Sequence, residues 1–301
     1  MRAIVTGGAG FIGSHVADAL LARGDEVHVL DDLSKGKAER VADGIDLHVA
    51  DIRDPDAVFD RVAPELVFHL AAQADVRVSV ERPTYDADVN VQGTLRILEA
   101  ARRHGARIVF ASTGGAIYGE CDAPAPETAE RRPLSPYGTS KLAAEEYLAT
   151  WNRLYGTKHV SLRLANVYGP RQEPHGEAGV VAIFMGLLHD GGTPTIYGDG
   201  SQTRDYVFVS DVASAMLAAA AHAEGGVFNV GTGRETSVTA LYDAIQAAAG
   251  VERAPRHAEA RLGELQRSVL DARLAERELG WRAEHLLDAG LAKTWEWIGQ
   301  E

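Results

Sequence analysis

The chain has 301 residues, enough for one large domain or two small ones, and its 46% hydrophobic and 24% charged content is typical of a globular protein. Its net charge of −13 and pI near 5.3 argue against a nucleic-acid partner, because a phosphate backbone would be repelled. The single cysteine, Cys121, excludes an internal disulfide, the longest apolar run (180–188) is too short to cross a bilayer, and no signal-peptide pattern follows Met1, so we expect a cytoplasmic protein without membrane contact.

Short apolar runs alternate with amphipathic runs through the first half of the chain. Strands are predicted at 3–6, 26–30, 46–49, 66–70, 108–111 and 160–164. These runs of Val, Ile, Leu and Phe do not alternate with polar residues, which is typical of strands buried on both faces. The repeated strand–helix–strand order predicts an α/β fold with a Rossmann-type, doubly wound parallel sheet.

The second half is less regular. A loop containing one helix is expected at 169–194, strands at 207–209 and 227–230, a helix at 211–221, and mainly helices from residue 236 onward. We predict a nucleotide-binding domain at 1–165, to which the chain returns at about 200–232. Residues 166–199 and 233–301 would form a smaller α/β substrate domain.

Three glycines, Gly7, Gly10 and Gly13, lie between the first strand and the first helix. In this position Gly7 allows a tight turn, Gly10 allows close approach of a diphosphate, and Gly13 lets the helix pack against the sheet. The amide groups at the start of the helix favour the negative charge. The pattern predicts a dinucleotide-binding loop.

Two carboxylates, Asp31 and Asp32, end the second strand. A carboxylate here can accept hydrogen bonds from the adenosine ribose hydroxyls and would repel a 2′-phosphate. We therefore favour NAD over NADP, although Lys35 and Lys37 lie near.

A Tyr-x-x-x-Lys pair, Tyr137 and Lys141, follows Ser135 and Pro136, which suit the cap and the first position of a helix. Residues four apart share one helix face. A phenol is a poor base because its unperturbed pKa is ~10, but a nearby ammonium lowers that pKa. The pair indicates acid–base chemistry.

The spacing Gly-x-x-Gly-x-x-Gly resembles that of the extended short-chain dehydrogenase/reductases, in particular the NAD-dependent epimerases and dehydratases. Further similar segments are Asp51-Ile52, the run from His69 to Ala74, and Tyr137-x-x-x-Lys141. The resemblance implies that NAD is bound by Gly7, Gly10, Phe11, Ile12, Gly13, Asp31, Asp32, Leu33, Ser34, Lys35, Asp51, Ile52, Leu70, Ala71, Ala72, Gln73, Asn90, Tyr137, Lys141 and Ala165.

The family has a catalytic Ser or Thr after the fifth strand. When the two sequences are aligned from the fifth strand, Thr113 takes this position. When they are aligned from Tyr118-Gly119, Gly114 takes it instead. Ser112 is a possible substitute for the catalytic hydroxyl. We prefer Thr113 because glycine has no hydroxyl. The next residues, Gly114-Gly115, lack the acid that related dehydratases and decarboxylases place there, which leaves reversible oxidation at C4 as the best reaction.

The resemblance extends to the substrate side through Arg163-x-x-Asn166, Gly198-x-Gly200-x-x-x-Arg204 and Arg261-x-Gly263-Glu264. Two arginines suit a diphosphate through charge-assisted hydrogen bonds. Ser268, where some relatives carry a bulky Tyr, suggests a roomy sugar pocket. The implied substrate-binding residues are Thr113, Asn166, Val180, Tyr197, Arg204, Arg261 and Glu264.

The resemblance implies NAD-dependent 4-epimerisation of a UDP-hexose, UDP-glucose or UDP-galactose, through a transient 4-keto sugar. Alternatives are a UDP-glucuronate or other nucleotide-sugar 4-epimerase, a nucleotide-sugar reductase, and a dinucleotide-sensing protein without catalysis. The helices expected at 84–103 and 137–155 imply a homodimer. The eleven histidines show no metal-ligand spacing, so no metal is expected.

Overall fold

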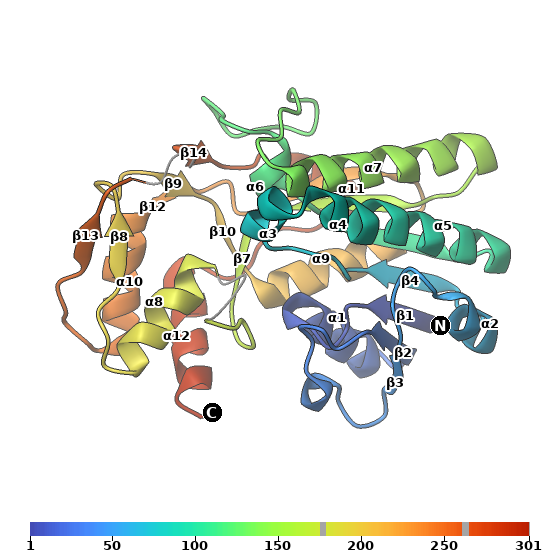
Figure 1. Ribbon diagram of the computed structural model, residues 1–301, viewed down its shortest axis with the longest axis horizontal. Coiled ribbons are helices and arrows are strands. Elements are labelled where there is room, and N and C mark those ends of the chain that lie inside the picture. The colour runs from blue at the N-terminus through green and yellow to red at the C-terminus, as the bar shows by residue number, and fades with distance from the viewer. Residues whose placement is uncertain (175–178, 261–264, 301) are drawn as a thin grey trace.

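A computed structural model describes residues 1–174, 179–260 and 265–300 (Figure 1). Its centre is a parallel sheet of seven strands in the order β11-β6-β5-β4-β1-β2-β3, which confirms the predicted Rossmann-type sheet. The strands are β1 (Arg2–Thr6), β2 (Glu26–Asp31), β3 (Asp46–Val49), β4 (Leu66–His69), β5 (Arg107–Thr113), β6 (Val160–Leu164) and β11 (Gly226–Val230).

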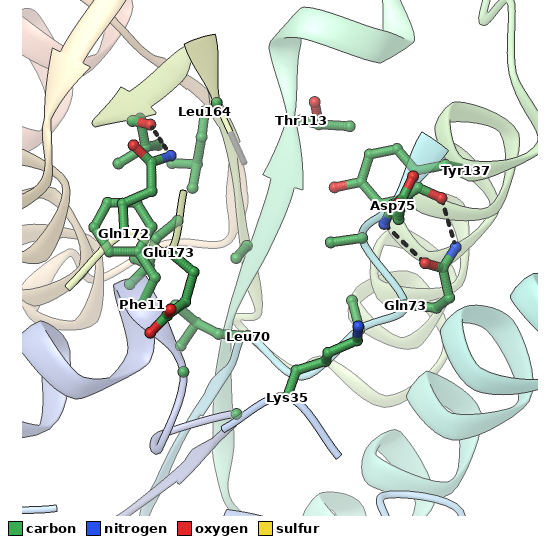
Figure 2. A pocket seen from close by; sticks show the side chains of 18 of the residues that line it. Phe11, Lys35, Leu70, Gln73, Asp75, Thr113, Tyr137, Leu164, Gln172 and Glu173 are labelled. Atoms are coloured by element: carbon green, nitrogen blue, oxygen red, sulfur yellow. Dashed lines mark hydrogen bonds between the residues drawn. The ribbon is translucent and has the colours of Figure 1, made fainter. Parts of the chain in front are cut away.

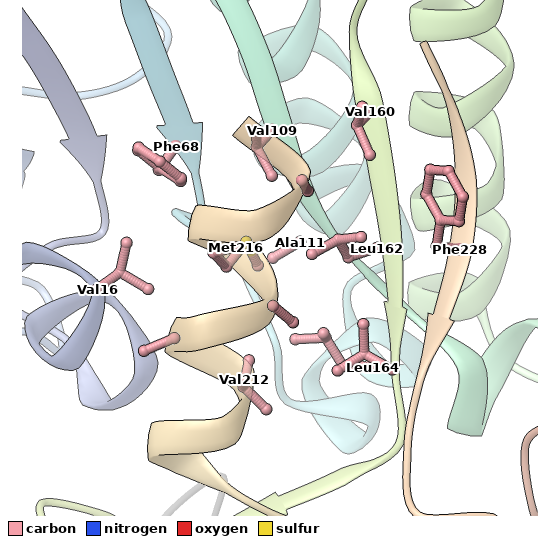
Figure 3. Packing of buried hydrophobic residues seen from close by; sticks show 14 of the residues in the cluster. Val16, Phe68, Val109, Ala111, Val160, Leu162, Leu164, Val212, Met216 and Phe228 are labelled. Atoms are coloured by element: carbon pink, nitrogen blue, oxygen red, sulfur yellow. The ribbon is translucent and has the colours of Figure 1, made fainter. Parts of the chain in front are cut away.

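Helices cover both faces of this sheet. On one face lie α1 (Phe11–Ala22), α9 (Val209–Ala221) and α11 (Arg273–Leu279), and on the other lie α2 (Asp56–Val62), α5 (Gly93–His104) and α7 (Pro136–Tyr155). Figure 3 shows Val16 of α1 and Met216 of α9 packed against Phe68 and Val109 of the strands. The central strands are buried on both faces and are mostly apolar, whereas the edge strand β3 is partly exposed.

The helix expected at 84–103 is interrupted. Pro83 begins a short helix, α4 (Pro83–Ala87), which runs through a π-helical segment, η2 (Asp88–Gln92), into α5. Segments of this kind occur mainly at functional sites. The other short helices are η1 (Ala38–Arg40), α3 (Val76–Glu81) and α6 (Gly114–Ile117).

A smaller part packs around α8 (Val180–His189), α10 (Val238–Ala249) and α12 (Leu287–Ile298), which share an apolar core and lie at the left of Figure 1. Its short strand pairs are β7 (Asn166–Tyr168) with β10 (Tyr206–Phe208), β8 (Thr195–Tyr197) with β13 (Arg256–Ala258), and β9 (Thr203–Arg204) with both β12 (Thr236–Ser237) and β14 (Arg267–Ser268). The expectation of mainly helix after residue 236 missed β12, β13 and β14, which are two or three residues long and too short to show a period.

The chain builds β1, β2 and β3 toward one edge of the sheet and then crosses back to β4, which pairs with β1 on its other side. Ligands of open parallel sheets bind where the strand order reverses in this way, outside the carboxyl ends of the strands. In the part of the chain that the structure describes, every helix is too short or too polar to span a membrane.

Candidate active site

A cavity of about 1070 Å³ opens at the carboxyl ends of the central strands. Residues that directly follow β1, β2, β3 and β4 line one part of it, and the ends of β5 and β6 line the rest. Figure 2 shows the side chains of Phe11 and Glu173 on one side and those of Gln73 and Tyr137 on the other. The position and size suit a dinucleotide together with a second ligand.

The glycine loop between β1 and α1 has little space for side chains. Gly7 has a φ of +70°, and a Cβ there would lie 2.7 Å from the backbone nitrogen of Ala71. A Cβ on Gly13 would lie 2.1 Å from the carbonyl oxygen of Gly7. These contacts explain why glycine is needed at both positions for the first turn of α1 to pack against the sheet.

Asp31 and Asp32 both line the cavity after β2. Asp31 is buried and accepts hydrogen bonds from the backbone N–H groups of Ala9 (3.0 Å) and Leu33 (2.9 Å), so it also fixes the glycine loop. Burial raises the pKa of Asp31 above its ordinary value, and the two N–H donors oppose that rise. Leu33, a predicted cofactor residue, is not among the described residues that line the cavity. Its backbone N–H donates to Asp31 in this turn.

Asp51 and Ile52 line the cavity after β3. The guanidinium of Arg53 forms a forked ion pair with Asp51, which lowers the pKa of that carboxyl, and it also contacts Asp88. Ile52 is buried against Gly93, where an added Cβ would lie 2.6 Å from its side chain. This wall therefore offers an apolar side chain and a carboxylate of fixed orientation.

The predicted catalytic residues come from β5 and α7. Thr113 is the last residue of β5, and α7 is capped by Ser135, whose Oγ accepts a hydrogen bond from the Gly138 N–H at 3.2 Å. Thr113, Tyr137 and Lys141 all line the cavity, and in Figure 2 the hydroxyl of Tyr137 points into it on the side of Thr113. The hydroxyl-bearing Thr113, the phenol Tyr137 and the amine Lys141 thus line the same cavity.

Lys141 is buried at the base of this group. Its Nζ donates a hydrogen bond to the carbonyl oxygen of Ala111 at 2.9 Å and lies 4.7 Å from the centre of the Phe110 ring. Burial lowers the pKa of Lys141 to about 8, and the carboxylates of Asp86 and Glu145 oppose that change. The side chain is therefore a cation at neutral pH. It lies one helical turn from Tyr137, the phenol that it would activate.

Ser112 provides an independent indication of a ligand. The residue is part of the cavity wall, and its buried Oγ has no hydrogen-bond partner among the described residues. A buried hydroxyl without a partner is costly unless a bound molecule supplies one. The Ser112 hydroxyl, the glycine loop and Asp31 together suit a bound dinucleotide. No group of described His, Cys, Asp and Glu residues could hold a metal ion.

The resemblance implies that Asn90 contacts the cofactor directly, but Asn90 contacts Gln73 in the structure. It is buried in η2, is not among the described residues lining the cavity, and is hydrogen-bonded to Gln73 instead. Its Nδ2 donates to the Gln73 carbonyl and its Oδ1 accepts from the Gln73 N–H, each at 2.8 Å. Asn90 thus fixes the backbone of the loop after β4, and Gln73 itself lines the cavity.

Besides Thr113 of β5, the predicted substrate residues belong to the smaller part of the molecule. Four of these line the cavity, and they are Asn166 of β7, Val180 at the start of α8, Tyr197 of β8 and Arg204 of β9. Arg261 and Glu264 lie outside the described residues. Ser268 is buried beside Arg204 in the β9–β14 pair, behind the described lining of the cavity.

Several lining residues were not predicted. Gln172 and Glu173 lie six and seven residues after Asn166 in the sequence, so extending the Arg163-x-x-Asn166 segment would have found them. Arg82 and Tyr85, with the guanidinium 4.5 Å from the ring centre, line the cavity between α3 and α4, and nothing in the sequence distinguished them. The remaining predicted cofactor residues, Gly10, Ile12, Ser34, Lys35, Leu70, Ala71, Ala72 and Ala165, line the cavity as well.

Comparison with known proteins identifies relatives over the whole chain. Residues 3–231 match the NAD dependent epimerase/dehydratase family. The UDP-glucose 4-epimerase of Mycolicibacterium smegmatis is 49% identical, with 99% of this chain and 98% of the relative covered. The crystal structure of the Thermotoga maritima UDP-glucose 4-epimerase with UDP-glucose has a TM-score of 0.97 at 45% identity over 100% of this chain and 99% of that one. The Thermus thermophilus UDP-glucose 4-epimerase in complex with NAD has a TM-score of 0.93 at 48% identity, covering 99% of each chain.

Proposed function

The chain belongs to the NAD dependent epimerase/dehydratase family, and from that membership we propose that it interconverts UDP-glucose and UDP-galactose by reversible oxidation at C4 of the hexose. One observation carries the proposal: Thr113, Tyr137 and Lys141 line the same cavity as the glycine loop and Asp31. Similarity to UDP-glucose 4-epimerases across the full length, including structures with UDP-glucose and with NAD, supports it.

Two chain groups would move the proton of the 4-hydroxyl. Tyr137 acts as general base, because the Lys141 ammonium one helical turn away favours the phenolate. Thr113, across the cavity, orients the hydroxyl and passes its proton toward Tyr137. The same residues return the proton when C4 is reduced again, so the reaction has no net redox change.

The cofactor NAD supplies hydride acceptance and return when it is bound. The glycine loop would hold its diphosphate at the start of α1, and Asp31 and Asp32 would face the adenosine ribose, where carboxylates disfavour a 2′-phosphate. Asp51 and Ile52 lie where the adenine would sit. Ser112 offers its unpaired hydroxyl to the same ligand.

The substrate would be held by its nucleotide part more firmly than by its sugar. Arg204 of β9 is a cation in the cavity wall that suits the diphosphate, and Tyr197 of β8 suits the uracil. Presenting both faces of C4 requires that the hexose turn between oxidation and reduction. A firm hold on the nucleotide with a loose hold on the sugar meets that requirement.

Alternative sugars stay open. A UDP-glucuronate 4-epimerase would need a cation near C6, and Arg82, which was not predicted, lines the cavity. A reductase is less well supported, because it must exchange its cofactor in each turnover. An eliminating enzyme is disfavoured by Gly114 and Gly115, which place no acid after Thr113.

We also propose a homodimer formed through α3, α5 and α7. Large apolar side chains are exposed on two of these helices, α3 and α7: Val76 (44%), Val80 (62%), Tyr147 (39%), Leu154 (66%) and Tyr155 (51%). Exposed apolar groups on adjacent helices favour association. Light scattering during gel filtration would give twice the chain mass.

A cytoplasmic location also stays a prediction, based on composition alone.

The test of the function is incubation of the purified chain with UDP-galactose, without added cofactor, and identification of the product by NMR. Formation of UDP-glucose supports 4-epimerisation with retained NAD. Conversion only after repeated addition of free cofactor would point to the reductase. No conversion of UDP-galactose with NAD present, together with conversion of UDP-glucuronate, would transfer the activity to the uronate.

A further inference from the structure

A carboxylate outside the predicted catalytic set, that of Asp86, is completely buried on α4. Its Oδ1 accepts hydrogen bonds from Gln73 Nε2 (2.8 Å) and Asn90 Nδ2 (3.0 Å), and its Oδ2 accepts one from Ser140 Oγ. The two amide nitrogens can only donate, and the hydroxyl also donates, so the Asp86 carboxyl group accepts three hydrogen bonds.

These three donors belong to different parts of the active site. Gln73 lines the cavity after β4, and its backbone is fixed by Asn90 of η2. Ser140 is on α7, directly before Lys141. One carboxylate therefore joins the cofactor-facing loop, the π-helical segment and the catalytic helix. The arrangement also explains why Asn90 points away from the cavity.

Asp86 is one of four titratable groups around the Lys141 ammonium. Tyr137 lies one turn before Lys141 on α7, and Glu145 lies one turn after it, in a forked ion pair with Arg163. His69 of β4 is held by Thr6 and Thr94, and burial lowers its pKa to about 3, so it is neutral. Among the described residues no cation pairs with Asp86, so its charge is available to Lys141.

We propose that Asp86 is a positioning residue for the reaction, whose buried carboxylate fixes the Gln73 loop against α7 and acts electrostatically on Lys141, the residue next to Ser140. The inference rests on the proposed function, because Lys141 is the group that favours the Tyr137 phenolate. Asp86 acts through Lys141 and Gln73 and touches neither ligand.

The substitution Asp86→Asn separates charge from structure. The asparagine oxygen can accept from Gln73 and Asn90, and its amide can donate to Ser140, whose hydroxyl then accepts, so the hydrogen bonds survive while the charge is lost. Asp86→Ser is a second charge-free variant, in which a water can fill the vacated volume. Glu81→Gln, on exposed α3, is the matched control that removes the same charge from a neighbouring helix.

The direct measurement is a pH titration by NMR of the purified protein with lysine labelled with carbon-13 at Cε. The sequence has five lysines, so the Lys141 signal is assigned by its loss in Lys141→Met. In the wild type we expect this signal to titrate near pH 8, because burial lowers the pKa of Lys141 to about 8. We expect the titration in Asp86→Asn and Asp86→Ser to move down by about one pH unit or more, and that in Glu81→Gln to stay in place.

Activity is then measured against pH on the same proteins. The alkaline fall of kcat/KM should move down with the Lys141 titration, and kcat at neutral pH should fall about tenfold in Asp86→Asn. A Lys141 titration that does not move in folded Asp86→Asn would overturn the inference. So would a loss of activity that is equal at every pH, with no shift in the pH profile of kcat/KM, because that result marks a purely structural role. If the wild type converts no nucleotide sugar, the proposed function fails, whereas the NMR shift still decides the role of Asp86.

Discussion

Two neighbouring hydroxyls at the end of β5, those of Ser112 and Thr113, have different surroundings. Both line the cavity. Thr113 is the final residue of the strand, where the chain turns into α6, whereas Ser112 is buried and has no described partner. Thr113 therefore suits a reacting hydroxyl that changes partners, and Ser112 suits a fixed hydrogen bond to a bound cofactor. The sequence alone had left this choice open.

We expect Thr113→Ala to lower kcat about 10²-fold and Tyr137→Phe about 10²- to 10⁴-fold, because each removes a proton-transfer group. Ser112→Ala should leave kcat within about threefold and weaken NAD binding instead, since one hydrogen bond is lost. Steady-state kinetics and cofactor titration of the three variants give the comparison. A larger loss of kcat in Ser112→Ala than in Thr113→Ala would reverse the assignment.

The buried Lys141 predicts a pH dependence with opposite signs for activity and stability. Burial lowers the pKa of Lys141 to about 8, from a value of 10.5 in the unfolded chain. As pH rises through about 8 the folded protein loses the ammonium, so kcat/KM should fall. Over the same range, up to about 10.5, the unfolded chain binds the extra proton, so this group makes the free energy of unfolding rise with pH.

Profiles of kcat/KM and of urea unfolding, measured on the same samples between neutral and alkaline pH, test these signs. A fall in activity with a parallel fall in stability in this window would show unfolding in place of Lys141 deprotonation.

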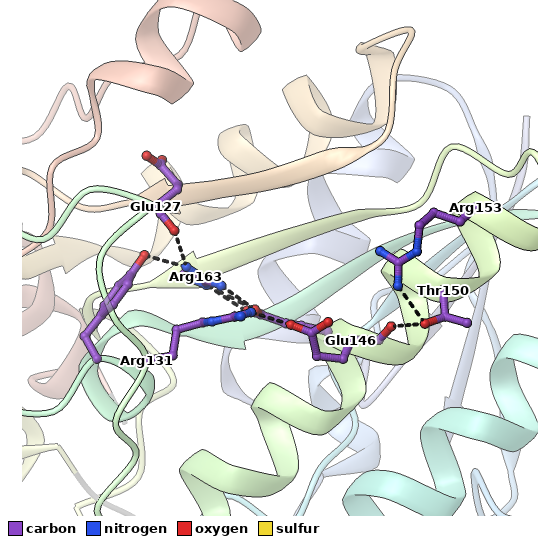
Figure 4. Close-up of polar contacts among 8 residues, drawn as sticks. Glu127, Arg131, Glu146, Thr150, Arg153 and Arg163 are labelled. Carbon is purple, nitrogen blue, oxygen red and sulfur yellow. Dashed lines mark hydrogen bonds and ion pairs between the residues drawn. The ribbon is translucent and has the colours of Figure 1, made fainter.

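At the scale of elements, α7 is attached to β6 by a buried ion pair. The guanidinium of Arg163 forms a forked contact with Glu145, with distances of 2.7–3.1 Å, and also donates to the Tyr118 hydroxyl and the Glu127 carbonyl. Arg163 and Glu145 have 3% and 2% of their side chains exposed. Figure 4 shows this group beside the exposed pair of Arg131 and Glu146.

Removing one partner of the buried pair should leave an unpaired charge. We expect Glu145→Ala to lower the free energy of unfolding by about 3–5 kcal/mol. Glu146→Ala, one residue away on the same helix, should cost less than about 1 kcal/mol because its pair with Arg131 is exposed to solvent. Urea unfolding of both variants measures the difference, and equal losses would contradict the argument.

The segment after β7 closes one side of the cavity. Glu173 lines the cavity and pairs with Lys37 (2.7 Å) and with Arg40 of η1, while His15 of α1 contacts the Pro170 carbonyl at 2.9 Å. The segment therefore connects the glycine-loop side of the cavity to the side that carries Asn166. Such a connection would retain a bound cofactor.

We expect Glu173→Ala to speed the loss of bound NAD about two- to fivefold, because a partly exposed pair contributes up to about 1 kcal/mol. The exposed Glu39→Ala, in the same η1 turn as Arg40, is the matched control and should change nothing. NAD released during repeated buffer exchange is measured by absorbance. Equal rates for both variants would show that the segment does not hold the cofactor.

For the whole molecule, the long regular parts could be predicted and the short irregular parts could not. The strands at 46–49 and 160–164 were predicted with the observed bounds. The second is buried on both faces, a pattern that is distinctive in the sequence, and the first is a short edge strand. The two-residue strands β9, β12 and β14 depend on partners far along the chain and carry no period. The division into two domains stays a prediction.

The site shows the same distinction. Motifs with fixed spacing, such as Gly7 to Gly13 and Tyr137 to Lys141, indicated residues that line the cavity. Asn90 and Asp86 could not be placed from sequence, because their roles depend on hydrogen bonds between α4, η2, α7 and the loop after β4. Helix and strand patterns predict elements, whereas these contacts arise only when the elements pack.

Epimerisation by transient oxidation requires that the hydrogen at C4 leaves and returns as hydride without exchange with water. NMR of the UDP-glucose formed from UDP-galactose deuterated at C4, with the purified chain in ordinary water, tests this requirement. We expect the product to keep its deuterium at C4. Product that carries ordinary hydrogen at C4 would show proton exchange with solvent and would contradict the proposed oxidation.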